Sequence, residues 1–206
     1  MRTPDGKITS FDDPEAGTGA YQGTSPESIN DLGFIAGYYT DGNYFNHGFL
    51  RTPEGKFISI DAPGAVTSSY GTIIYGLNDL GTVAGYWFDA NYAAHGFVRT
   101  LDRHFTSFEA PGAGTGISNS GYTEGTFVTA LNVEGATTGF GVDTNADANS
   151  FVRTANGRVT TFTIPGQILG GGNDYGSAGF AINAKGIVVG RWRDTNYALH
   201  GYILVP

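Results

Sequence analysis

The sequence contains no cysteine, and this absence excludes disulfides, thiolate metal sites and a cysteine nucleophile. Basic residues are scarce too: 11 Lys and Arg stand against 19 Asp and Glu, which gives a formal net charge of -8. Such a charge disfavours nucleic acid or an anionic membrane surface as a partner. Cations, neutral sugars, other small molecules and proteins remain as partner classes.

Long apolar runs are also absent. No run reaches the roughly 18 residues that a membrane-spanning helix needs, so we expect no membrane insertion. The chain opens on the polar stretch MRTPDGK, which has no secretory signal character. A signal replaced by an initiator Met would leave the same sequence, so an exported and a cytoplasmic location both stay open.

Glycine, in contrast, is abundant, with 33 of 206 residues, beside 14% aromatic and 40% hydrophobic residues. This composition is too apolar for a disordered chain and is typical of many short strands joined by tight turns. The length allows either one domain or two small ones.

Four Asn-x-x-Gly turns mark four internal repeats, and they begin at Asn30, Asn78, Asn132 and Asn183. The distance from each of the first three Asn residues to a later Pro is constant, and so is the distance from a preceding Gly to each Asn. All length variation therefore lies in the connection between that Pro and the next Gly. Repeats of this length indicate stacked or radially arranged units.

Within a repeat, β-branched and aromatic runs bounded by turn residues predict four strands. In the second repeat the turn NDLG leads into TVAGYWF, the longer loop DANYAA follows, and HGFVRT comes next. Short hairpins make such strands antiparallel neighbours. Because each small sheet would have two apolar faces, only adjacent sheets can cover them.

We therefore expect an all-β fold, a single four-bladed β-propeller over residues 1–206 with four antiparallel strands per blade. The blades cover about 23–63, 71–111, 125–165 and 176–206, and residues 1–14 complete the last blade because they align with a fourth strand. Pairing of the two chain ends would close the ring and remove an exposed edge. Two separate two-repeat domains are the alternative.

The repeated patterns [ILA]N..G...G, HGF.RT..G and PGA resemble the HAF family of bacterial extracellular repeats over essentially the whole chain. HGF occurs at His47 and His95 and HGY at His200, whereas the third repeat departs from the pattern with NSF at 149–151. The resemblance implies a surface or exported bacterial setting. It transfers no catalytic residue, because the family motif is itself structural.

The long loops of all blades share one face, and binding residues concentrate on loops held by a rigid scaffold. The longest connections, at 112–124 and 166–175, are rich in Gly, Ser, Asn and Tyr, which suits a glycan or peptide as well as a plain flexible link. The candidate ligand-binding residues are Tyr21, Tyr70, Tyr75, Tyr122, Tyr175, Trp192 and Arg193.

Asp and Asn recur two residues apart in the fixed loop of every blade. Their oxygens could hold calcium, or they could shape the loop through bonds to nearby amides, and the occurrence in all four blades favours the loop role. Further calcium ligands are missing from the pattern, so no cofactor is required. The weak metal candidates are Asp41, Asp89, Asp143 and Asp194. The repeated His residues likewise fit a role as anchors of their own blades better than a shared metal site.

Residues that break the repeat are more informative about function. Glu27 stands where other repeats carry Tyr, Thr or Phe, and Arg191 and Arg193 replace aromatic or neutral residues. These residues belong to the first and last blades, which would adjoin in a closed ring. Glu27 and Arg191 are candidate catalytic residues, with a salt bridge across the closing interface as the simpler explanation.

No nucleophile motif, phosphate loop or paired metal motif is present in the sequence. We expect a ligand- or partner-binding module that presents its variable-loop face to a glycan, small molecule or protein. The alternative is an enzyme, a lyase, hydrolase or isomerase, with one pocket at the seam between the first and last blades. The sequence leaves the oligomeric state open.

Overall fold

The computed structural model describes residues 6, 8–66, 70–118, 120–170 and 176–206, and these form β-strands without any helix. The first repeat contains β1 (Gly23–Ile29), β2 (Ile35–Thr40), β3 (Asn46–Arg51) and β4 (Phe57–Ile60). The second contains β5 (Thr72–Leu77), β6 (Val83–Phe88), β7 (Ala94–Arg99) and β8 (Phe105–Phe108). The third contains β9 (Gly125–Leu131), β10 (Thr137–Val142), β11 (Ala148–Arg153) and β12 (Val159–Phe162). The fourth contains β13 (Ser177–Ile182), β14 (Val188–Arg193) and β15 (Leu199–Leu204).

Consecutive strands within each repeat pair antiparallel, which confirms the all-β class and the four-stranded plan of the first three repeats. A single parallel pair, Ala94 with Gly125, joins the second and third repeats into one eight-stranded sheet. No described helix could span a membrane.

The repeats pack face to face, and the apolar core lies between them. Val83 and Phe97 of the second repeat pack against Ala36 and Leu50 of the first. In the same way, Val128 and Phe151 of the third repeat cover Ala84 and Val98 of the second. The second repeat thus packs one face of its strands on the first repeat and the other face on the third, as alternation along a strand requires.

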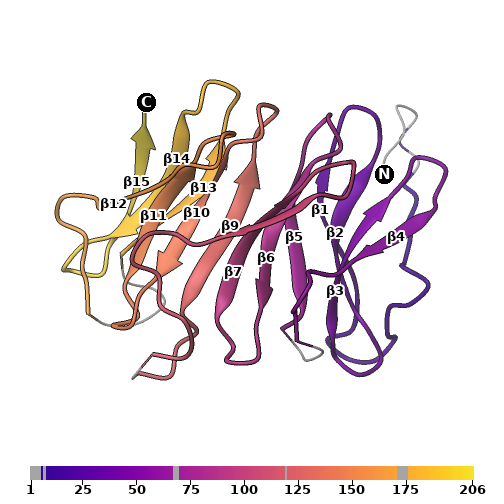
Figure 1. Cartoon of the computed structure of the whole chain (residues 1–206), viewed down its shortest axis with the longest axis horizontal. Coiled ribbons are helices and arrows are strands. Elements are labelled where there is room, and N and C mark those ends of the chain that lie inside the picture. Colours follow the sequence, from indigo (N-terminus) through magenta and orange to yellow (C-terminus); the bar gives the residue numbers. More distant parts are fainter. Residues whose placement is uncertain (1–5, 7, 67–69, 119, 171–175) are drawn as a thin grey trace.

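The repeats form an open row, with the first (indigo) and the fourth (yellow) at opposite ends of the long axis (Figure 1). The predicted closed ring is not found in the described part of the chain. Instead of pairing with β15, the N-terminal segment packs on the first repeat, where Phe11 and Ala16 join the cluster of Ile35 and Tyr39. The guanidinium of Arg51 also lies 4.8 Å from the Phe11 ring centre. These contacts hold the segment at the end of the row away from β15.

The Asn-x-x-Gly turns connect neighbouring repeats through a ladder of side-chain hydrogen bonds. Asn30 Nδ2 donates to the Asn78 carbonyl at 3.2 Å, and Asn78 Nδ2 donates to the Asn132 carbonyl at 3.2 Å. Asn132 Nδ2 in turn donates to the Asn183 carbonyl at 2.8 Å. Each Oδ1 meanwhile accepts backbone amides of its own turn, as Asn78 does from Leu80 and Thr82. One side chain therefore shapes its turn and holds the next repeat.

Replacing Asn78 by Ala should lower the free energy of unfolding by about 2–4 kcal/mol, because buried partners in two repeats lose their bonds. Asn183→Ala is the matched control: it removes the same turn bonds at the end of the row and should cost only about 1 kcal/mol. Urea unfolding followed by circular dichroism measures both losses. Equal losses would show that the ladder between repeats contributes nothing.

Candidate functional site

The four Asp-x-Asn loops are held together by their own backbone amides. Asp89 Oδ1 accepts the N–H groups of Asn91 and Ala93 at 2.8 and 2.9 Å, and Tyr92 between them has a left-handed φ of 62°. The same two bonds recur at the other candidate metal ligands, Asp41, Asp143 and Asp194. Among the described residues no three metal-ligating side chains gather. Loop formation accounts for the positions of these carboxylates.

Next to this loop, three repeats carry an aromatic ring stacked on a histidine. In the second repeat Trp87 stacks on His95 with ring centres 4.4 Å apart, and Trp87 Nε1 donates to Ser107 Oγ at 3.1 Å. His95 Nδ1 lies 2.5 Å from Glu109, and Nε2 lies 3.4 Å from Asp89. Equivalent stacks occur between Tyr39 and His47 and between Trp192 and His200. The histidines thus bind to their own repeats and do not converge on one another.

The third repeat lacks both members of this pair. Gly141 stands at the position of Trp87, and Asn149 stands at the position of His95. A Cβ added to Gly64 or to Gly166 would meet a tryptophan ring at 3.5 or 3.7 Å, but at the equivalent Gly112 it would meet nothing within 4 Å. The space that the ring fills elsewhere is therefore open in the third repeat.

A cavity of about 290 Å³ occupies this place. Its walls come from the loop at Asp143, from β10, β11 and β12, and from the connection that precedes the repeat. The lining residues are Pro111, Gly112, Ala113, Gly141, Asp143, Asn149, Thr161, Phe162 and Thr163. The volume lies just below the usual range of small-molecule pockets, about 300–1,000 Å³. The cavity opens among the long loops, the face on which the sequence predicts binding.

The polar groups of the cavity include donors and acceptors that no described residue uses. Asn149 Oδ1 accepts a hydrogen bond from Gln167 Nε2 at 3.0 Å, which leaves its Nδ2 as a donor. Asp143 Oδ1 serves the loop, whereas no histidine faces its Oδ2 because Asn149 replaces it. In the second repeat Ser107 bonds to Trp87 and Glu109 bonds to His95. Thr161 and Thr163 stand at these two positions in the third repeat. Sequence reasoning missed this site, although its signal was the loss of the aromatic residue and the histidine in the same repeat.

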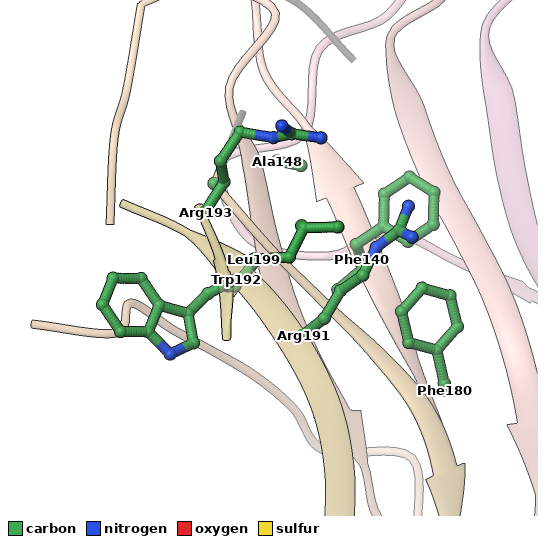
Figure 2. Close-up of a pocket in the computed structure, with 10 residues that line it drawn as sticks. Phe140, Ala148, Phe180, Arg191, Trp192, Arg193 and Leu199 are labelled. Atoms are coloured by element: carbon green, nitrogen blue, oxygen red, sulfur yellow. The ribbon is translucent and has the colours of Figure 1, made fainter. Parts of the chain in front are cut away.

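A second cavity, of about 180 Å³, lies between the third and fourth repeats, and the two arginines that break the repeat line it (Figure 2). Arg191 points toward Phe140 and Phe180, and its guanidinium lies 5.2 Å from the Phe180 ring centre. Arg193 donates to the Tyr197 carbonyl at 3.0 Å. Trp192 points to the opposite side of β14, where it stacks on His200.

Glu27 is not part of this cavity. It belongs to β1 at the other end of the row, where it lines a shallow groove with Phe11, Ile29 and Ile35. Partial removal from water raises the pKa of its carboxyl. The proposed pairing of Glu27 with Arg191 inside one chain is therefore not found, because the first and fourth repeats do not adjoin.

The tyrosines predicted to bind a ligand do not share one site. Tyr21 is almost fully exposed, and Tyr70 and Tyr122 lie half-exposed in two different connections. Tyr75 lies within the row and stacks on a neighbouring tyrosine ring. Tyr175 lies outside the described residues. The structure therefore brings together Trp192, Arg191 and Arg193 on one strand, but on two faces of it.

The loop aspartates should make stability dependent on acid. Burial by itself would raise the pKa of Asp89, but the amides of Ala93 and Asn91 outweigh it and lower the pKa below the ordinary value. A carboxyl with a lowered folded-state pKa stabilises the fold above its unfolded pKa of about 4 and loses this effect as pH falls. Asp89→Asn keeps the accepting oxygen and should flatten the fall in melting temperature between about pH 5 and pH 2. An unchanged pH profile would contradict this role.

No family model and no curated protein matches the sequence. Among solved structures, the chain is similar to the BP39L lectin from Burkholderia pseudomallei, with 11% sequence identity and a TM-score of 0.43. The similarity covers 84% of this chain and 52% of that protein, so the chain spans about half of the lectin's length.

Proposed function

We propose that this protein is a non-catalytic binding module and that its ligand enters the third-repeat cavity. The observation that carries the proposal is the open space at Gly112, where Gly64 and Gly166 face tryptophan rings. The frame around the cavity is the same as in the second repeat, so its shape is set by packing that does not depend on a ligand. A preformed slot of this kind avoids much of the ordering cost of binding.

The chemistry of the lining favours a neutral sugar ring. Asn149 Nδ2 and the threonine hydroxyls can donate, Asp143 Oδ2 can accept, and Pro111 with Ala113 offers an apolar wall. A sugar presents donors and acceptors around its rim and C–H groups on its faces, which matches this mixture. The net charge of -8 and the carboxylate of Asp143 disfavour an anionic ligand.

The HAF resemblance supports an exported, bacterial setting for this module, in which glycans are available as ligands. An enzymatic role has less support, because Glu27 and Arg191 lie at opposite ends of the row of repeats.

Refilling the cavity tests the proposal. Gly141→Trp with Asn149→His recreates the ring pair of the second repeat. A Cβ at position 141 would approach the Ala110 methyl at 2.9 Å, and the connection before the second repeat, which accommodates Trp87, carries Ala62 at the position of Ala110. The native protein should bind at least one member of a panel of glucose, galactose, mannose, fucose and N-acetylglucosamine. At a sugar concentration 100 times Kd, binding should stabilise the fold by about 2.7 kcal/mol, seen as a raised melting temperature.

The refilled variant should fold and lose this shift, because its own side chains occupy the slot. Asn196→His introduces the same residue in the exposed loop of the fourth repeat and should retain the shift. The proposal fails if no sugar of the panel raises the melting temperature, or if the refilled variant binds as tightly as the native protein.

A further inference from the structure

The outward face of the fourth repeat is bare where the other repeats are covered. Val189 on β14 is 43% exposed, whereas its equivalents Ala36, Ala84 and Thr138 are all 0% exposed. On β15, Ile203 is 71% exposed, and its equivalents in the first two repeats, Leu50 and Val98, are 6% and 8% exposed. Val189 and Ile203 are aliphatic residues like Leu50 and Val98, which pack against a following repeat.

Within the described residues the same repeat has three strands, β13, β14 and β15, where the other repeats have four. In the first repeat β3 pairs with β4, with Gly48 opposite Ile60, and corresponding pairs occur in the second and third repeats. Within the described residues β15 pairs only with β14, so its other edge is open. Exposed strand edges are ready partners for another strand.

The N-terminal segment at the other end of the row is a fourth strand without a sheet. Asp13 N donates to Thr24 Oγ1 at 2.8 Å, just as Ala62 N donates to Thr72 Oγ1 at 3.0 Å where β4 leads into the second repeat. Phe11 packs on the first repeat as Ile60 packs on the second. Residues 8–11 thus lie against the first repeat as the last strand of a preceding repeat would. The first repeat with residues 8–11 and the exposed face of the fourth repeat are therefore the two surfaces that meet where one repeat packs on the next.

The first and fourth repeats carry opposite charges at positions that pack together between other repeats. Between the first and second repeats, Tyr38 and Tyr75 pack in one cluster. The residue equivalent to Tyr38 in the last repeat is Arg191, and the residue equivalent to Tyr75 in the first repeat is Glu27. Neither forms an ion pair with a described residue of its own chain. An interface between the last and first repeats would place this arginine against this glutamate.

The hydrogen bonds between Asn-x-x-Gly turns also stop at the first and fourth repeats. Asn132 Nδ2 donates to the Asn183 carbonyl, whereas no described residue accepts a hydrogen bond from Asn183 Nδ2. The turn at Asn30 begins the ladder at the other end and receives no such bond in the described structure. An interface between the fourth repeat of one chain and the first repeat of another would let Asn183 Nδ2 donate to the Asn30 carbonyl.

We propose that the bare face of the fourth repeat binds the first repeat of a second copy of this chain. In this head-to-tail contact, one copy supplies residues 8–11 and Glu27, and the other copy supplies β15 and Arg191. Residues 8–11 add a fourth strand beside β15, and Glu27 pairs with Arg191. A second copy, and not the first repeat of the same chain, fits this face, because the first and fourth repeats lie at opposite ends of the row (Figure 1). Such a heterologous contact generates closed rings or open filaments. Arg191 of this contact also lines the cavity in Figure 2.

Charge reversal tests the contact. Sedimentation velocity over a range of protein concentrations should show multimers of the native chain. Arg191→Glu and Glu27→Arg should each weaken self-association by more than about tenfold, because each juxtaposes like charges. An equimolar mixture of the two variants should restore assembly, because in alternating copies each introduced charge faces one of opposite sign. Arg158→Glu reverses an exposed charge beside β12 of the third repeat, outside the proposed contact, and should leave assembly unchanged.

Cysteine cross-linking distinguishes contact between two copies from contact within one chain. Only introduced cysteines can react, because the chain has no native cysteine. The double variant Glu27→Cys, Arg191→Cys should form covalent multimers on oxidation. A cross-linked monomer, or a native chain that stays monomeric at every concentration, would overturn the proposal. Circular dichroism confirms that each variant is folded, and because the third-repeat cavity is untouched, failure of sugar binding and failure of assembly are separate results.

Discussion

The asparagine of each Asn-x-x-Gly turn is the constraint on which the rest of this structure depends. Its Oδ1 closes the turn between the first two strands of a repeat, and its Nδ2 bonds to the equivalent turn of the next repeat. Because one side chain performs both tasks, the hairpin geometry and the stacking distance are set together. The register of the apolar side chains between sheets then follows from the strand alternation that begins at this turn.

A frame held in this way tolerates differences elsewhere. The connection between repeats varies in length without moving the ladder, since the ladder joins turns at the opposite ends of the strands. The third repeat also loses an aromatic–histidine pair, while Val128 and Phe151 remain fully buried against the second repeat. A change at the loop end of a sheet therefore opens a cavity without unpacking the core.

The sequence was sufficient to predict the repeats, the strands and the turn, because these depend on local residue types and on spacing. The asparagine bonds between Asn30, Asn78 and Asn132 join the very positions that define the repeat. Closure could not be predicted from the same information, because it depends on where the N-terminal segment packs. The contact of Phe11 with the first repeat keeps that segment from β15. The cavity was also not predicted, because an absent side chain becomes informative only when its neighbours in space are known.

The third repeat can lack its ring pair because other bonds join it to the fourth. Ser150 Oγ donates to Ser177 Oγ at 3.0 Å, and the Tyr202 hydroxyl donates to Ser150 Oγ at 2.9 Å, so a buried polar network spans the two repeats. In the second repeat the position of Ser150 is Gly96, which has no side chain for such a bond. Since satisfied buried networks fix the arrangement of the parts that they join, the walls of the cavity stay in place without a ring to support them. A cavity left by two missing side chains needs this kind of support from the neighbouring repeat, and the third repeat has it.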